Sequence, residues 1–102
     1  MEKYKIRYTA AFYEDLSEAV EYIDTVLKNP YSADRLIDSV EKAIIKRSSY
    51  PLSFRPCSLK HHHDHDYYSI NVGNYAVFYV VIDDVMEVRR FIYARRSIGD
   101  II

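Results

Sequence analysis

Apolar and polar positions along the first quarter of the chain predict a short strand followed by a helix. Residues 4–8 alternate with period two, which is typical of a strand with one apolar face. Thr9 then has the chemistry of a helix N-cap. Apolar side chains recur at three- and four-residue steps from Phe12 through about Leu27 and form one helical stripe.

A second amphipathic helix is expected directly after the first. The pair Asn29–Pro30 interrupts the first stripe, because proline disfavours a helical residue before it. A new stripe then runs from near Ser32 to about Ser48. Two helices joined by so short a link are expected to form an antiparallel hairpin.

The pattern in the last third of the chain predicts three strands. Residues 67–72 form the first, and Gly73–Asn74 is a two-residue hairpin signal. Residues 75–82 are apolar at almost every position, so both faces of this middle strand are expected to be largely covered. Residues 85–93 form the final strand, and residues 97–102 could add one helical turn.

The order strand, two helices, three strands predicts a single α+β domain over residues 1–102. The helix hairpin is expected to pack on one face of a small, curved, mainly antiparallel sheet. A chain of 102 residues, 49% of them hydrophobic and 28% charged, has the size and balance of one globular domain.

Composition narrows the function classes. The net charge of −1 argues against nucleic-acid binding by bulk electrostatics. The single cysteine, Cys57, excludes an intramolecular disulfide. No apolar run approaches the ~20 residues of a membrane helix, and no signal-peptide pattern opens the chain, so a cytoplasmic protein is expected. Glycine-rich phosphate loops and nucleophile elbows are missing, and no cofactor is expected.

A polar tract, His61-His62-His63-Asp64-His65-Asp66, offers imidazole and carboxylate groups that suit zinc or nickel. Six consecutive residues in a loop converge poorly on one ion, so a solvated loop is favoured and no functional metal is expected. Histidine titrates near neutrality, and one of these side chains could act as a general acid or base.

Arginines cluster in the final strand and just after it. Guanidinium groups bind phosphate bidentately and stay charged. Strand alternation places Arg89 and Arg90 on opposite faces, so both cannot serve one site. Arg95 and Arg96 follow Tyr93 where the strand ends. The alternative is that these arginines pair with acids of the first helix, where five acids fall within residues 14–24.

This element order, together with the segments Val-Gly-Asn-Tyr-Ala-Val-Phe-Tyr at 72–79 and Tyr-Ala-Arg-Arg-Ser-Ile at 93–98, resembles the RelE/ParE toxin superfamily of type II toxin–antitoxin modules, often labelled plasmid stabilization proteins. The resemblance implies a small α+β domain whose concave sheet side carries the activity. It also implies a toxin neutralised by a cognate antitoxin, acting either as a ribosome-dependent mRNA endonuclease or as a non-enzymatic DNA gyrase poison.

For the endonuclease, the resemblance places a phosphate-facing catalytic set at Arg96, Arg95 and Tyr93. Acid–base groups are missing from the usual places, since the C-terminal tyrosine of some members falls at or near Ile102. His63 and His65 are the candidate replacements in the catalytic set.

Other basic positions of the endonuclease pattern are depleted. A second arginine falls on Ala76, and two lysines fall on Ser69 and Asn71. Lys60 and Arg55, with Asn71, are the candidate substrate-binding residues. The depletion keeps three interpretations open: an mRNA interferase, a gyrase poison, or a degenerate member that retains only antitoxin binding.

Antitoxin binding has a separate physical argument. The middle strand is apolar on both faces, and only one face can meet the helix hairpin. The other face, with Phe78 and Val80, is therefore expected to be an exposed apolar patch that an antitoxin covers with a helix or an added strand. The expected assembly is a homodimer or a toxin–antitoxin hetero-oligomer, with no membrane partner.

Overall fold

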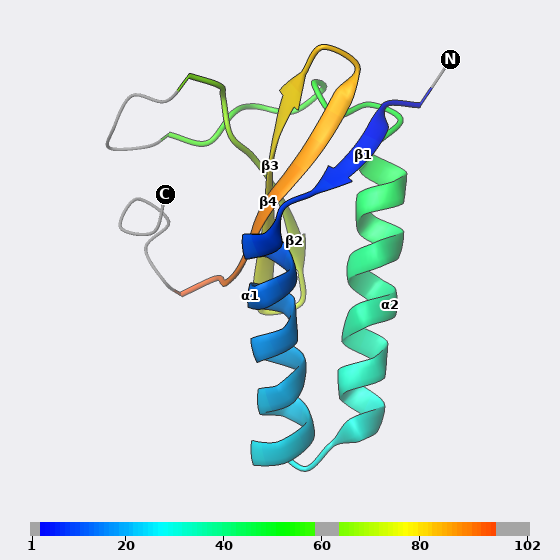
Figure 1. Cartoon of the computed structure of the whole chain (residues 1–102), viewed down its shortest axis with the longest axis vertical. Helices are drawn as coiled ribbons and strands as arrows, with labels where there is room; N and C mark the ends of the chain where they lie inside the picture. Colours follow the sequence, from blue (N-terminus) through cyan, green and yellow to red (C-terminus); the bar gives the residue numbers. More distant parts are fainter. Residues whose placement is uncertain (1–2, 59–63, 96–102) are drawn as a thin grey trace.

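The computed structural model of the chain describes residues 3–58 and 64–95. Within them the order of elements confirms the predicted α+β domain (Figure 1). The elements are β1 (Lys5–Tyr8), α1 (Ala10–Glu21), a π-helical turn η1 (Tyr22–Val26), α2 (Pro30–Arg47), β2 (Tyr68–Val72), β3 (Tyr75–Ile82) and β4 (Val85–Tyr93). The predicted turn at 97–102 lies outside the described residues.

Side-chain caps set where the two helices begin. The Thr9 hydroxyl accepts a hydrogen bond from the Phe12 backbone N–H at 3.2 Å, as expected of an N-cap. The Asn29 side chain accepts one from the Ser32 N–H at 3.1 Å and caps α2. The helix α2 therefore starts at Pro30 and not near Ser32, because proline fits the first helical position, where no N–H partner is required.

The sheet has four strands in the order β1-β4-β3-β2. Its two antiparallel pairs, β2 with β3 and β3 with β4, form the predicted meander, and β1 lies parallel to β4 at the other edge. Gly73 sits at φ +59° in the two-residue turn between β2 and β3, where glycine is favoured. The helices lie side by side and extend beyond one end of the sheet (Figure 1).

One sheet face forms the main core with the hairpin. Aromatic and aliphatic side chains from α1, α2 and three strands pack there: Phe12, Ala19, Val40, Ile44, Tyr68, Ile70, Val72, Val77, Tyr79, Met86, Val88 and Phe91. The hairpin thus covers a single sheet face, as the sequence predicts.

The second sheet face is covered as well, which corrects one expectation. Phe78 is 7% exposed and Val80 is fully buried, so the patch predicted to be open is wrong for the isolated chain. These side chains cluster with Tyr67, and Cys57 packs against them. Both covering residues belong to the connection between α2 and β2, where the Cys57 N–H donates to the Tyr67 carbonyl at 2.7 Å.

Candidate functional site

A candidate catalytic residue, Tyr93, and a candidate substrate-binding residue, Asn71, lie on different faces of the sheet. Tyr93 is the register partner of Tyr75, whose ring packs against the helix-side core. Asn71 is exposed and pairs with Ala76, which belongs to the opposite face. Two named candidates therefore point to different sides of the sheet.

The other candidates that the structure describes lie in the connection before β2 and directly after β4. Arg55 is exposed in the connection before β2, and His65 is half-buried in the same connection. Arg95 is exposed two residues after β4. Arg96, His63 and Lys60 lie outside the described residues, so their roles stay predictions.

A β-bulge separates the two arginines of β4. Phe78 pairs with Arg90 and Tyr79 with Val88, which leaves Arg89 as the extra residue. The Arg90 guanidinium reaches α1 and binds both carboxylate oxygens of Asp15, at 2.7 and 2.9 Å. Pairing with an acid of the first helix is therefore confirmed for Arg90, whose guanidinium is not available to an anionic ligand.

Asp15 also binds the backbone of β4 along the part of its edge that β1 does not pair with. The carboxylate accepts a hydrogen bond from the Phe91 N–H at 3.0 Å, beyond the point where β1 ends. Thr9 serves the same edge, because its hydroxyl donates to the Arg89 carbonyl at 2.9 Å and its N–H to the Val88 carbonyl at 3.0 Å. The start of α1 thus takes over the hydrogen bonding of a neighbouring strand.

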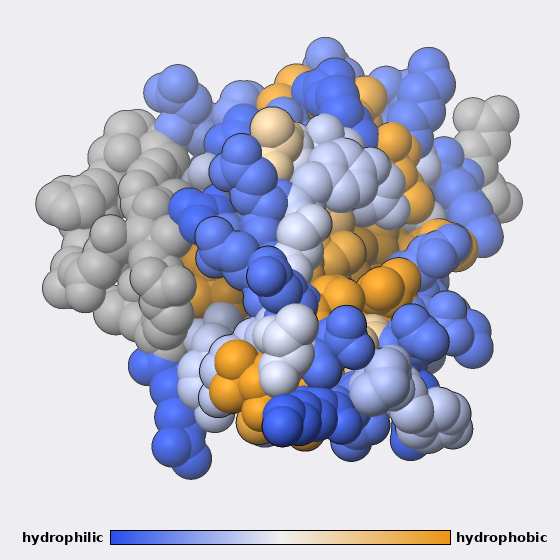
Figure 2. Space-filling view, turned by 60° about the horizontal axis from the view of Figure 1, so that its bottom comes forward, coloured by the Kyte–Doolittle hydropathy of each residue, from blue (hydrophilic) through white to orange (hydrophobic). Residues whose placement is uncertain are grey.

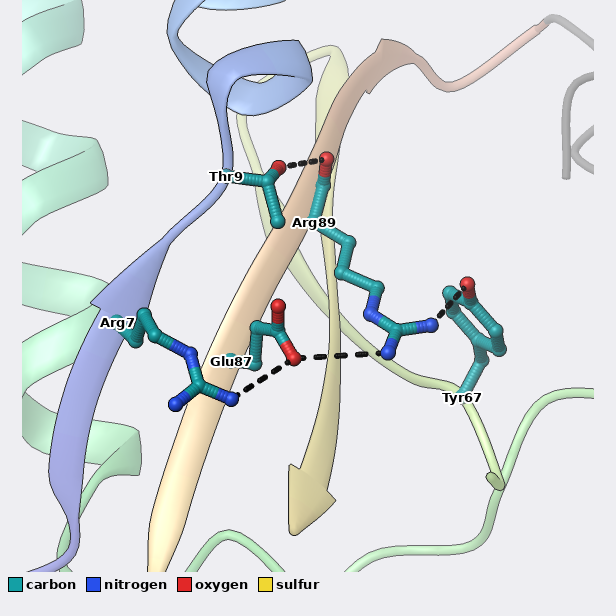
Figure 3. A network of polar contacts seen from close by, with 5 residues as sticks. All are labelled: Arg7, Thr9, Tyr67, Glu87 and Arg89. Atoms are coloured by element: carbon teal, nitrogen blue, oxygen red, sulfur yellow. Dashed lines mark hydrogen bonds and ion pairs between the residues drawn. The ribbon is translucent and has the colours of Figure 1, made fainter. Parts of the chain in front are cut away.

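Arg89 does not contact Asp15, and its guanidinium joins a polar network on the second sheet face (Figure 3). The Glu87 carboxylate lies 3.3 Å from the Arg7 guanidinium and 3.5 Å from that of Arg89. A second nitrogen of Arg89 donates to the Tyr67 hydroxyl at 2.9 Å. Two guanidinium groups around one carboxylate give this network an excess positive charge.

The protonation of Arg89 follows from its partners. Burial alone would lower its pKa, but the Tyr67 hydroxyl and the Glu87 carboxylate outweigh burial, and the pKa of Arg89 is raised. The guanidinium is therefore charged at any working pH. This cationic patch lies on the second sheet face, the one that the helix hairpin does not cover, and none of its members was a predicted site residue.

A groove of about 320 Å³ runs between the two helices near β1. Its walls are mostly apolar and come from all three elements: Tyr8, Phe12, Tyr13, Leu16, Ile37, Val40, Glu41, Ile44 and Ile45. Tyr13, Ile37 and Ile45 are 55%, 38% and 41% exposed. Figure 2 shows apolar side chains gathered in a hollow with polar side chains along its borders. We call this feature the hairpin groove.

The α2 border of the hairpin groove is acidic. Asp34, Asp38 and Glu41 are exposed and recur at helical spacing, so they share the side of α2 that carries Ile37 and Ile45. None of the three forms an ion pair with another described residue. An apolar groove with an acidic border suits an amphipathic helix that carries basic residues.

Among residues 3–58 and 64–95, no group of three histidine, cysteine, aspartate or glutamate side chains could hold a metal ion. The first three histidines of the predicted tract lie outside these ranges. No described helix is both long and apolar enough to cross a membrane.

The family model for the ParE toxin of type II toxin–antitoxin systems matches residues 6–98. The chain belongs to this ParE toxin family. It is therefore the toxin of a type II toxin–antitoxin system. A search of curated protein sequences finds no match.

Solved structures agree with this family fold. A chain of the chromosomal ParDE system from P. aeruginosa matches with a TM-score of 0.72 at 9% identity, covering 91% of this chain and 98% of that one. A chain of the RelB–RelE antitoxin–toxin complex from Methanococcus jannaschii matches with a TM-score of 0.50 at 24% identity, covering 93% and 96%. At these identities the likeness shows the fold alone; both neighbours come from toxin–antitoxin systems.

Sequence reasoning missed the hairpin groove and the network around Glu87. The signal for the groove was present, since Ile37 and Ile45 lie at the edge of the α2 stripe and next to acids. The network had no local signal, because Arg7 and Glu87 meet only through the parallel pairing of β1 with β4.

Proposed function

We propose that the cognate antitoxin neutralises this ParE-family toxin by placing a basic amphipathic helix in the hairpin groove. The observation that supports the proposal is an exposed apolar groove bordered on α2 by three acids that form no ion pair with residues 3–58 or 64–95. Burial of the exposed parts of Tyr13, Ile37 and Ile45 supplies the hydrophobic contribution. The acids select a partner of positive charge.

The test is an affinity measurement with the antitoxin encoded beside the toxin. An Ile45→Glu variant adds a charge to the groove wall, and the matched control, Leu52→Glu, adds one at an exposed apolar residue in the connection after α2. A charge left unpaired in an interface weakens binding by about 30-fold or more. Equal affinity of both variants for the antitoxin would refute the groove as its site.

We further propose that the toxin acts by binding its target, as a DNA gyrase poison, and not as an mRNA endonuclease. The supporting observation is that a candidate catalytic residue, Tyr93, lies on the helix side of the sheet while a candidate substrate-binding residue, Asn71, lies on the other. In addition, Ala76, Ser69 and Asn71 occupy positions where the endonuclease pattern has basic residues. Phosphate cleavage requires an acid, a base and cations at one point.

Two assays separate the mechanisms. Primer extension on mRNA from a translation reaction should show intact message, while a supercoiling assay with purified gyrase should show inhibition. Arg95→Ala and Arg89→Ala variants then test which of these two cations contributes to the inhibition of gyrase. New cuts that depend on ribosomes would refute the binding mechanism and restore the endonuclease with Arg95, Arg96 and the histidines as its candidates.

A further inference from the structure

A second hollow lies where the helix hairpin extends beyond the sheet. It measures about 480 Å³ and lies between the end of the hairpin and the end of the sheet, lined by Tyr22, Ile23, Leu27, Asn74, Tyr75 and Tyr93. We call it the tyrosine pocket. Because three of its six lining residues are tyrosines, its walls offer aromatic faces as well as hydroxyl groups.

The π-helical turn shapes the hairpin side of this pocket. Leu27 donates its N–H to the Tyr22 carbonyl at 3.2 Å, a five-residue step that widens the helix. The Thr25 hydroxyl donates to the Glu21 carbonyl at 2.7 Å and supports the same turn. Both ends of the five-residue step, Tyr22 and Leu27, line the pocket. Turns of this kind are frequent at functional sites.

The sheet side of the pocket is rigid. Tyr75 stacks on Phe91 with ring centroids 4.8 Å apart, and Tyr93 meets the Tyr75 ring edge-on at 5.5 Å. Burial, followed by the neighbouring phenols of Tyr93 and Tyr22, raises the pKa of Tyr75. Tyr22 and Tyr93 are 50% and 39% exposed, which leaves their rings open to a ligand.

Charges beside the pocket favour a cation. Glu18 lies one helical turn before Tyr22, is exposed, and acts electrostatically on Arg90 at the end of β4. Glu21 and Asp24 flank Tyr22 and Ile23 and are also exposed, and none of these three acids forms an ion pair in the described part of the chain. No cation–π contact among residues 3–58 and 64–95 uses the three pocket tyrosines, so their aromatic faces are not taken by a cation of the described chain.

We propose that the tyrosine pocket binds an arginine side chain of the antitoxin. The inference rests on the proposed antitoxin binding and adds a second, separate anchor to it. Ring faces attract cations, and a planar guanidinium stacks on them better than an ammonium does. Asn74 and the phenol hydroxyls supply acceptors for the guanidinium N–H groups. The exposed acids Glu18, Glu21 and Asp24 lie within one helical turn of Tyr22 and give this stretch of the hairpin a negative charge.

The direct test uses three small amides and needs neither toxicity nor antitoxin. N-acetyl-arginine methylamide carries the cation, N-acetyl-citrulline methylamide has nearly the same shape without charge, and N-acetyl-norleucine methylamide is apolar. Titration followed by NMR signals of the tyrosine rings should give the tightest binding for the arginine amide. A Tyr22→Leu variant should weaken it about two- to thirty-fold. Tyr31→Leu, at a tyrosine on α2 that does not line the pocket, should leave it unchanged.

Several results would overturn the proposal: no ring shifts with any amide, equal binding of citrulline, or tighter binding of norleucine. Antitoxin affinity tests whether the antitoxin supplies the arginine. Tyr22→Leu should lower this affinity by a factor similar to that for the arginine amide, and Tyr31→Leu should leave it unchanged. Unchanged antitoxin affinity in a variant that has lost the arginine amide would exclude the antitoxin as occupant. Failure of the hairpin groove proposal would instead appear as equal antitoxin affinity of Ile45→Glu and Leu52→Glu. That result would not affect the outcome of the amide titration.

Discussion

Replacing Asp15 with alanine removes the contact that joins α1 to the free edge of β4. The Asp15 carboxylate accepts two hydrogen bonds from Arg90 and one from the Phe91 N–H. The Asp15 and Arg90 side chains are 15% and 28% exposed, so water cannot fully replace the lost partner. In Asp15→Ala, a partly buried guanidinium and an edge N–H both lose their acceptor.

The expected loss of stability follows from these three bonds. A hydrogen bond to a charged group contributes about 1.5–3 kcal/mol, and breaking a buried ion pair costs about 3–5 kcal/mol. Arg90 keeps some access to water, so we expect Asp15→Ala to lower the free energy of unfolding by about 2–4 kcal/mol. For a domain of this size that corresponds to a Tm lower by about 10–20 °C.

Urea unfolding followed by circular dichroism measures this loss, with Glu14→Ala as the matched control. Glu14, the residue before Asp15 on α1, is an exposed acid, and its replacement should change the free energy of unfolding by less than about 0.5 kcal/mol. Asp15→Asn keeps one acceptor for the Phe91 N–H but loses the charge. Its free energy of unfolding should therefore lie between those of Asp15→Ala and Glu14→Ala. If Asp15→Ala were as stable as Glu14→Ala, the edge contact would not contribute as the geometry indicates.

Two further predictions concern tyrosines. Tyr79→Phe should cost about 1–3 kcal/mol in urea unfolding, because the buried hydroxyl donates to the Pro51 carbonyl at 2.8 Å and accepts from Arg47 at 2.9 Å; an unchanged midpoint would contradict this. Burial raises the pKa of Tyr8, Tyr68 and Tyr75 above 10.0, so the unfolded chain ionises first. These tyrosines should therefore leave stability unchanged between about pH 7 and pH 9 and lower it as the pH rises through 10, and a flat profile to pH 11 would refute it.

Features set by neighbouring residues were predictable from the sequence. Thr9 as an N-cap, the glycine turn at 73 and the apolar stripes of both helices depend on contacts within a few residues. The expected separation of Arg89 from Arg90 by strand alternation does not hold, because the bulge interrupts the alternation and Arg90 pairs with Phe78 of the second sheet face. The two guanidinium groups nevertheless bind different partners, Tyr67 and Asp15. The π-helical turn was not predicted, because the periodicity of Ile23 and its neighbours fits an α-helix equally well.

Features set by distant contacts were not predictable. The cover over Phe78 and Val80 comes from Tyr67 and Cys57, in a connection whose path has no periodic signal. The sequence showed correctly that β3 is apolar on both faces, but it could not show that the chain itself covers the second face. An antitoxin that reached Phe78 would first have to displace this connection, which makes the hairpin groove the more accessible apolar surface.

The formal net charge of −1 conceals local concentrations of charge. Acids that form no ion pair within residues 3–58 and 64–95 border the hairpin groove on α2 and lie on α1 and the π-helical turn beside the tyrosine pocket. The cations Arg7 and Arg89 lie on the opposite sheet face, around one carboxylate. A basic antitoxin and an anionic target surface would then be attracted to different sides of the toxin. On the functions proposed here, the toxin distinguishes its two partners by the sign of their charge.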